Sequence, residues 1–113
     1  MISKTPKPPY YAVIFTSLRT EVFEEYDKTS LRMIELAKKH DGYLGVESAR
    51  NELGITISYW KSLESIKDWK KDPEHEIAQQ KGKDLWYQSY RVRICKVERE
   101  YSCLLYTSPS PRD

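Results

Sequence analysis

The residues best suited to chemistry lie in one stretch, GITISYWKSLESIKDWKKDPEH, which runs from Gly54 to His75. Tyr59 and Trp60 are consecutive there, and Trp69 follows further along. Large aromatic side chains can wall a pocket for a flat organic ligand, and a neutral imidazole can accept a proton. The stretch could therefore form part of an active site. The same pattern is also typical of a strand that packs on a helix.

The three aromatic residues are expected to face different surroundings. Tyr59 and Trp60 are neighbours on a predicted strand, so their side chains must point to opposite sides of the sheet. One of them could line the helix side and the other a dimer contact. Trp69 lies on the apolar stripe of the predicted helix that follows, where a place in the core is expected. Packing alone is the alternative role for all three.

His75 and Arg50 are the candidate polar groups. His75 lies in the first turn of a predicted helix, where the positive end of the helix dipole disfavours a protonated imidazole. It could act as a base there, and an exposed, inert side chain is the alternative. Arg50 could neutralise a phenolate or enolate near an aromatic pocket. Glu47, in the same predicted strand as Arg50, is expected on the opposite face and is not a ready partner.

Motifs for other kinds of chemistry are absent from the sequence. There is no glycine-rich phosphate loop, no nucleophile elbow and no zinc-protease motif. His40 and His75 are the only histidines, so one chain cannot build a multi-histidine metal site. Cys95 and Cys103 fit neither a zinc pattern nor a disulfide framework. No metal is predicted.

The composition fits one compact soluble domain of 113 residues, 39% hydrophobic and 32% charged. The net charge of +2 is small and the charges are scattered, which argues against nucleic-acid binding. No apolar run approaches the ~20 residues of a membrane helix. The N-terminal residues lack the apolar core of a signal peptide, so a cytoplasmic location is expected.

Two helical regions are predicted from capping residues and from periodicity. Thr20 can cap the first, which ends in a basic turn before Gly42. Ser62 can cap the second. Asp72, followed by a proline at the first helical position, can start a further helical piece that ends near Gly82.

Four strands are predicted from segments rich in β-branched and aromatic residues. They cover residues 10–19, 43–51, 54–62 and 87–100, and the turn-prone residues 51–54 fit a hairpin between the second and third. The order β-α-β-β-α-β predicts the α+β, ferredoxin-like arrangement, with one antiparallel sheet and helices on one face. The other face has no third layer, so we expect a second subunit to cover it in a homodimer.

Both ends of the chain are expected to lie outside the domain. Residues 1–9 contain three prolines and are expected to form a disordered leader. Residues 102–113 break abruptly with the charged pattern before them, which indicates a disordered and non-native tail. A native tail rich in Ser and Pro is the alternative. The domain itself is expected over residues 10–101.

Three strings together resemble the antibiotic biosynthesis monooxygenase (ABM) superfamily, and in particular its small stand-alone bacterial members. They are GYLG at Gly42–Gly45, ESAR at Glu47–Arg50, and YWKSLESIKDW at Tyr59–Trp69. The resemblance covers residues 10–101 and implies a ferredoxin-like dimer whose paired sheets form a shared barrel. Some members oxygenate polycyclic phenols or quinols with dioxygen and without metal or flavin. A cofactor-independent monooxygenase is therefore implied.

Other members of the superfamily degrade haem with a strand-one Asn, a Trp after strand three and a helical His as iron ligand. Trp60 matches that Trp. The Asn position falls near Thr16, and the ligand position falls near Gln79, which is a poor haem ligand. His75 lies one helical turn earlier. The resemblance thus favours a reaction without haem.

The leading hypothesis is that the protein binds a small phenolic or quinol substrate, deprotonates it and excludes water while dioxygen reacts. The residues assigned to catalysis are His75 as the base, Trp60, and Arg50 for developing negative charge. Those assigned to substrate binding are Thr16, through a hydrogen bond, together with Tyr59 and Trp69.

The alternative hypothesis is a non-catalytic dimeric module that binds a small aromatic ligand or serves as a scaffold. The two differ in what they predict between the helices and the sheet. A cluster of Thr16, Trp60 and His75 around an open cavity would favour the enzyme. A cavity filled by Trp60 and Trp69 themselves would favour the scaffold.

Overall fold

The computed structural model describes residues 2–103. The order of its elements agrees with the order predicted from the sequence, except that the second helical region consists of two α-helices and a π-helix. The elements are β1 (Tyr10–Arg19), α1 (Tyr26–Lys38), β2 (Tyr43–Arg50), β3 (Leu53–Trp60), α2 (Leu63–Lys71), α3 (Pro73–Lys81), η1 (Gly82–Trp86) and β4 (Tyr87–Val97).

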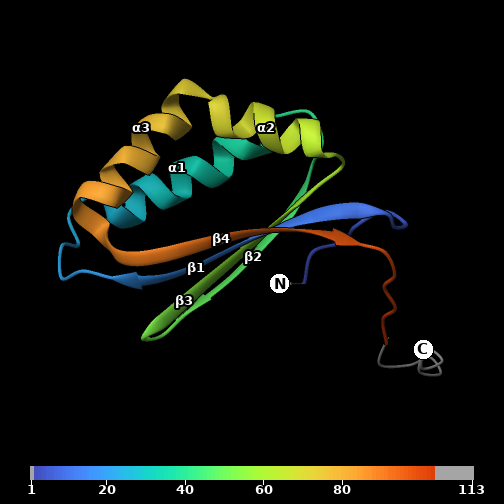
Figure 1. The fold of residues 1–113 in the computed structure, drawn as a ribbon, viewed down its shortest axis with the longest axis horizontal. Coiled ribbons are helices and arrows are strands. Elements are labelled where there is room, and N and C mark those ends of the chain that lie inside the picture. Colours follow the sequence, from blue (N-terminus) through green and yellow to red (C-terminus); the bar gives the residue numbers. More distant parts are fainter. Residues whose placement is uncertain (1, 104–113) are drawn as a thin grey trace.

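The four strands form one antiparallel sheet in the order β2-β3-β1-β4. All three α-helices lie on one side of this sheet, and among the described residues no helix lies on the other side (Figure 1). This confirms the predicted ferredoxin-like arrangement. The two faces of the sheet differ in surroundings, so the face to which each strand residue points decides its possible role.

Strand alternation places the core on the helix side. Trp60 lies opposite Tyr11 in the register of β1 and β3, and its side chain is fully buried. It packs with Ala37 of α1 and Ile66 of α2. We call the side of the sheet that bears Trp60 the helix face, and the other side the open face.

Two of the predicted helix caps are confirmed. The Ser62 hydroxyl accepts a hydrogen bond from the Ser65 amide at 3.1 Å. One carboxylate oxygen of Asp72 accepts from the amides of Glu74, at 2.9 Å, and His75, at 3.2 Å. These bonds satisfy amides that the first turn of a helix leaves without partners.

The predicted start of the first helix is wrong. Helix α1 begins at Tyr26, after Glu25 with a left-handed φ of 61°, and not next to Thr20. The Thr20 hydroxyl instead donates to the carbonyl of Leu85 at 2.6 Å. A contact between distant parts of the chain therefore takes the side chain that local pattern assigned to a cap.

The predicted β-hairpin is present with a shorter turn. Strand β2 ends at Arg50 and β3 begins at Leu53, so Gly54 belongs to the strand and not to the turn. Gly54 is buried, and a Cβ at this position would collide with the guanidinium of Arg50. The Arg50 side chain crosses directly over the Gly54 backbone, so a larger residue here would displace the guanidinium.

The described part of the leader contacts the sheet. Residues 2–9 form no regular secondary structure, but Ser3 donates from its amide to Glu47 at 2.8 Å and from its hydroxyl to the Val46 carbonyl at 3.1 Å. The Thr5 hydroxyl bonds to that of Tyr10 at 2.9 Å. This segment therefore lies against the sheet, and the disorder expected for residues 1–9 stays a prediction. Position 1 and the predicted tail from residue 104 onward lie outside the described residues.

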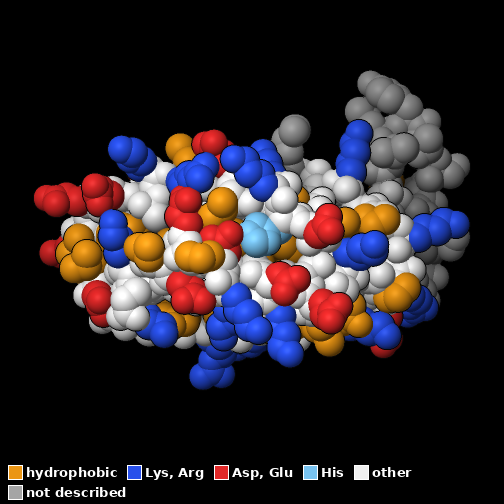
Figure 2. All heavy atoms as spheres, turned by 90° about the horizontal axis from the view of Figure 1, so that it is seen from above, with side chains coloured by type: hydrophobic (Ala, Val, Ile, Leu, Met, Phe, Trp, Pro, Cys, Tyr) orange, Lys and Arg blue, Asp and Glu red, His pale blue; other side chains and the backbone are white. Residues whose placement is uncertain are grey.

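The outer surface of the helix layer mixes both signs of charge. Basic and acidic side chains alternate over it with hydrophobic ones between them (Figure 2). No helix within residues 2–103 is long and apolar enough to cross a membrane.

Candidate functional site

Three aromatic rings run from the core of the domain to the start of α3. The rings of Trp60 and Trp69 are nearly parallel, inclined by 25° with centroids 6.0 Å apart. The imidazole of His75 then lies on Trp69, with centroids 3.9 Å apart and an angle of 14°. Trp60 is fully buried, whereas Trp69 and His75 are half-buried. The stack therefore begins in the core and ends near solvent.

The hydrogen bonds of His75 determine which ring nitrogen is basic. Its Nδ1 lies 2.9 Å from the carbonyl oxygen of Trp69, which can only accept a hydrogen bond. In the neutral ring Nδ1 therefore carries the proton and Nε2 carries the lone pair. The amide nitrogen of Gln79 also lies 3.1 Å from Nδ1, but it is itself a donor and makes no hydrogen bond to a protonated Nδ1. Nε2 is thus the atom that could accept a proton.

Burial lowers the pKa of His75 below the ordinary value for histidine, because a buried imidazole loses hydration when it is charged. The bond to the Trp69 carbonyl and the charge of Asp72 oppose this effect, but they are smaller. A neutral His75 was expected from the helix end. The neutral form is favoured in the structure, with burial as the main cause.

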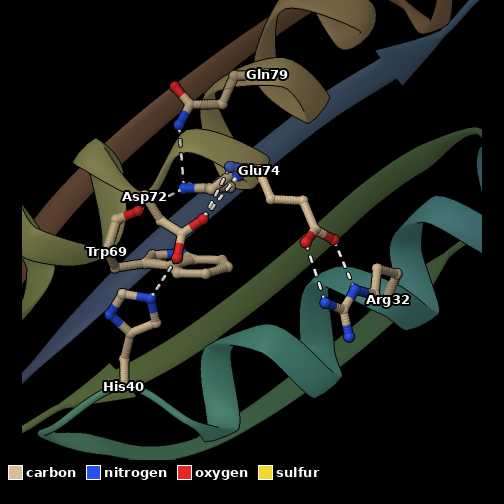
Figure 3. A network of polar contacts seen from close by, with 7 residues as sticks. Arg32, His40, Trp69, Asp72, Glu74 and Gln79 are labelled. Atoms are coloured by element: carbon tan, nitrogen blue, oxygen red, sulfur yellow. Dashed lines mark hydrogen bonds and ion pairs between the residues drawn. The ribbon is translucent and has the colours of Figure 1, made fainter.

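Asp72 connects this stack to the turn after α1. Its second carboxylate oxygen lies 2.7 Å from Nε2 of His40, while the first caps α3 (Figure 3). The bond to His40 is the main reason that the pKa of Asp72 is lowered. Figure 3 also shows Arg32 of α1 holding Glu74 through two hydrogen bonds, at 2.6 and 3.0 Å. These contacts fix the start of α3 against α1.

Thr16 and Tyr59 point away from this stack. Both lie on the open face, because they alternate in β1 and β3 with residues that face the helices. The expected opposition of Tyr59 and Trp60 is confirmed. The Tyr59 hydroxyl donates to Glu47 at 2.7 Å. Burial and this bond raise the pKa of Tyr59 to about 12.

The β1 residue that faces the helices is Ser17, one position after Thr16. Ser17 is 2% exposed and its hydroxyl accepts a hydrogen bond from Arg50. Arg50 and Glu47 lie on opposite faces, as predicted. A cluster of Thr16, Trp60 and His75 does not form, because a shift of one residue along a strand reverses the face.

The space between sheet and helices beside the stack is filled. Trp60 occupies it, and Tyr11, Val13, Tyr43 and Trp69 pack around the buried cluster. This is the arrangement that the scaffold hypothesis predicts. Two shallow hollows among residues 2–103 lie elsewhere, one on the open face and one at the surface between α2 and α3. The buried Trp60 is closed to a substrate, and the half-buried Trp69 and His75 form the end of the stack nearest solvent.

A second aromatic cluster at the other end of α1 was missed by the sequence reasoning. Tyr87 donates to the hydroxyl of Tyr26 at 3.2 Å, and burial, followed by this bond, raises the pKa of Tyr87. The guanidinium of Arg19 lies 3.4 Å from the centre of the Tyr26 ring. The cluster adjoins η1, and π-helices are frequent at functional sites. No local pattern in the sequence signals these contacts.

Metal and haem ligands are not assembled at the stack. No group of three or more His, Cys, Asp or Glu residues that could hold a metal ion occurs in the described part of the chain. Gln79, at the position implied for an iron ligand, lies against His75, with its amide nitrogen 3.1 Å from Nδ1. The side chains at this site thus suit proton transfer and stacking with an aromatic ligand.

The sequence is similar to that of an uncharacterised protein, YqjZ of Bacillus subtilis. The two are 50% identical over 101 residues, which is 88% of this chain and 89% of YqjZ. No family model matches the sequence.

Solved structures share the fold at low sequence identity. SnoaB of Streptomyces nogalater, a cofactor-independent oxygenase, superposes with a TM-score of 0.71 and 8% identity, over 82% of this chain and 97% of SnoaB. A proposed antibiotic biosynthesis monooxygenase from Nitrosomonas europaea gives a TM-score of 0.65 and 12% identity, over 93% of this chain and 99% of that protein. The fold is therefore that of the ABM proteins.

Proposed function

We propose that this chain, which belongs to the family of YqjZ and has the ABM fold, is a cofactor-independent monooxygenase of a small phenolic or quinol substrate. The observation that carries the proposal is the state of His75. Its Nδ1 is engaged by a carbonyl, its Nε2 carries the lone pair, and its lowered pKa keeps it neutral near pH 7. A general base at the end of an aromatic stack suits an aromatic substrate with an acidic hydroxyl.

The proposed reaction begins with transfer of the substrate hydroxyl proton to Nε2 of His75. The resulting phenolate is electron-rich and reduces dioxygen directly. One oxygen atom forms a bond to substrate carbon, and the other leaves as water with two hydrogens from the substrate. The substrate is oxidised and dioxygen is reduced, so no further reductant is required.

The other assigned residues take different places in this proposal. Trp60 is fully buried, so it packs against the core side of the Trp69 ring and does not touch the substrate. Trp69 supplies the surface on which the ring of His75 is held. Tyr59 and Arg50 make their hydrogen bonds away from the stack, and Thr16 lies on the open face, so the three receive no part in the reaction.

We also propose that the protein is a cytoplasmic homodimer. The open face exposes apolar side chains, among them Ile55 at 39% and Leu53 at 49%, which a second copy would cover. Cys95 is a free, exposed thiol, and such thiols persist in a reducing compartment.

The filled space beside Trp60 favours a second candidate, a non-catalytic module. Oxygen uptake by the full-length protein, with a panel of quinols and polycyclic phenols and with a metal chelator present, separates the two. Oxygen uptake that persists in the presence of the chelator supports the cofactor-independent oxygenase. If no member of the panel is oxidised, and a parallel haem titration leaves the Soret band unchanged, the module becomes the better account.

A further inference from the structure

The second histidine of the chain, His40, lies beside the proposed site, in the turn after α1. Its backbone is fixed to the core, because its amide donates to the carbonyl of Ala37 at 3.0 Å and its carbonyl accepts from the amide of Tyr43 at 3.3 Å. Ala37 belongs to the buried cluster, and Tyr43 packs against that cluster. The turn therefore holds His40 in a defined place next to the corner between α2 and α3.

The side chain of His40 makes two contacts with that corner. Its Nε2 lies 2.7 Å from a carboxylate oxygen of Asp72, and the two side chains are only 22% and 15% exposed (Figure 3). An ionised carboxylate can only accept a hydrogen bond, so Nε2 of His40 donates. The His40 ring also meets Trp69 edge to face, with centroids 5.1 Å apart and an angle of 73°. His40 thus contacts both the residue that caps α3 and the residue on which His75 is stacked.

Asp72 connects His40 to His75 through hydrogen bonds. The carboxylate oxygen that does not contact His40 accepts from the backbone amide of His75 at 3.2 Å. The carbonyl of Trp69 accepts from the amide of Asp72, at 3.2 Å, and from Nδ1 of His75, at 2.9 Å. Trp69, Asp72 and His75 are therefore joined in one closed set of hydrogen bonds. A displacement of the Asp72 carboxylate would remove contacts that orient the first turn of α3 and the ring of His75.

The start of α3 has another contact with α1, which provides a comparison. Arg32 holds Glu74 through two hydrogen bonds, and the Glu74 carboxylate points to Arg32 (Figure 3). Both of these side chains are 43% exposed. Exposed ion pairs contribute little to stability, because water and salt screen them. The less exposed bond from His40 to Asp72 is therefore the better candidate for fixing this end of α3.

We propose that His40 is a positioning residue for the proposed base: it orients Asp72, and Asp72 keeps the imidazole of His75 flat on Trp69 with Nε2 as its basic atom. This inference rests on the proposed function, because it concerns the same base. The charged and titratable groups that act on His75 are Asp72, His40 and Glu76. The competing explanation is that His40 only ends α1 and packs on Trp69. It predicts a loss of stability with no change at His75.

Proton NMR of the full-length protein tests the proposal, because the sequence contains only two histidines and His75→Gln assigns their ring signals. The ring current of Trp69 should shift the C–H protons of His75 upfield, since the two rings are stacked 3.9 Å apart. In His40→Ala, which removes the donor to Asp72, these signals should move back toward those of an unstacked imidazole. The pKa of His75 should rise toward about 6.5, because the ring becomes more hydrated. The initial rate of quinol oxidation should fall at least about 10-fold.

Two variants serve as controls. His40→Gln is the conservative variant, because its amide group can still donate an N–H to Asp72. It should retain the wild-type ring signals of His75 and a pKa close to the wild-type value. Arg32→Gln removes the exposed contact with Glu74 and should leave the signals of His75 unchanged. If His40→Ala does not fold, His40→Asn makes the same test, since its shorter amide does not reach Asp72.

Three results would overturn the proposal. The first is that His40→Ala melts at a lower temperature while the ring signals and the pKa of His75 stay at their wild-type values. The second is that Arg32→Gln moves these signals as far as His40→Ala does, since any lost contact at α3 would then have the same effect. The third is that His40→Gln behaves like His40→Ala. Failure of the proposed function would look different: the wild type would consume no oxygen, while the signals of His75 would still respond to His40→Ala.

Discussion

The imidazole of His75 lies flat on the indole of Trp69, with ring centroids 3.9 Å apart and planes inclined by 14°. This contact is held by the Trp69 carbonyl, which fixes Nδ1 of the same histidine. One residue of α2 thus determines both the orientation and the protonated nitrogen of a residue in α3. The proposed base is preorganised, and its stacking and pKa lead to separate tests.

The pH dependence of stability tests the buried state of His75. Its folded-state pKa is below the unfolded value of about 6.5, so the unfolded chain binds more protons between these two values. The contribution of His75 to the free energy of unfolding should be fully present above about pH 6.5. It should be lost as the pH falls from this value toward the lower folded-state pKa. The free energy of unfolding can be measured by urea titration of wild type and His75→Gln between pH 7.5 and 5, at one fixed ionic strength. It should depend less steeply on pH in the variant. Equal slopes would contradict a buried neutral imidazole.

The core position of Trp60 predicts a large stability effect. Because its ring is fully buried, Trp60→Ala should cost about 3–5 kcal/mol. Trp69→Ala should cost less, since Trp69 is only half-buried. Denaturant unfolding of both variants measures the difference. A smaller loss for Trp60→Ala than for Trp69→Ala would contradict the burial described above.

Asp72 has two roles that substitution can separate. Asp72→Asn keeps a side-chain oxygen to cap α3 and loses the charge next to His40, whereas Asp72→Ala loses both. The melting temperature should fall in the order wild type, Asn, Ala. Asp68→Asn, in an exposed position of α2, is the control and should melt like wild type. Equal melting of the Ala variant and wild type would mean that the cap is not formed.

Gly82 is predicted to be intolerant of a side chain. A Cβ there would lie 2.8 Å from the ring of Tyr87, and the glycine has ordinary helical backbone angles, so the effect is steric. Gly82→Ala should lower the melting temperature, while Lys83→Ala, an exposed neighbour, should not. If Gly82→Ala melts at the wild-type temperature, the close packing of η1 on Tyr87 is wrong.

The parts of the fold that follow from local signals were predictable from the sequence. Ser62 and Asp72 were identified as caps because a cap depends only on residues two or three positions away. Thr20 was misassigned because its partner, the Leu85 carbonyl, is distant in the chain. The π-helix that follows α3 also gave no local signal.

The candidate site shows the same division. Strand alternation was enough to separate Tyr59 from Trp60, and the helical stripe was enough to bring Trp69 toward Trp60. Thr16 was placed on the wrong face, because an error of one residue along a strand turns a side chain to the other side. The contact between Tyr26 and Tyr87 depends on tertiary packing that periodicity does not encode.

The central claim is that His75 is the base of an oxygenation reaction. The most direct test is the initial rate of oxygen uptake with a quinol that the wild type oxidises, measured for wild type, His75→Gln and Glu76→Gln. Loss of a general base should slow His75→Gln at least about 100-fold, and Glu76→Gln, an exposed neighbour, should keep the wild-type rate. Wild-type uptake should persist somewhat below pH 6.5, because the pKa of His75 is lowered. A folded His75→Gln variant that retains the wild-type rate would contradict the claim.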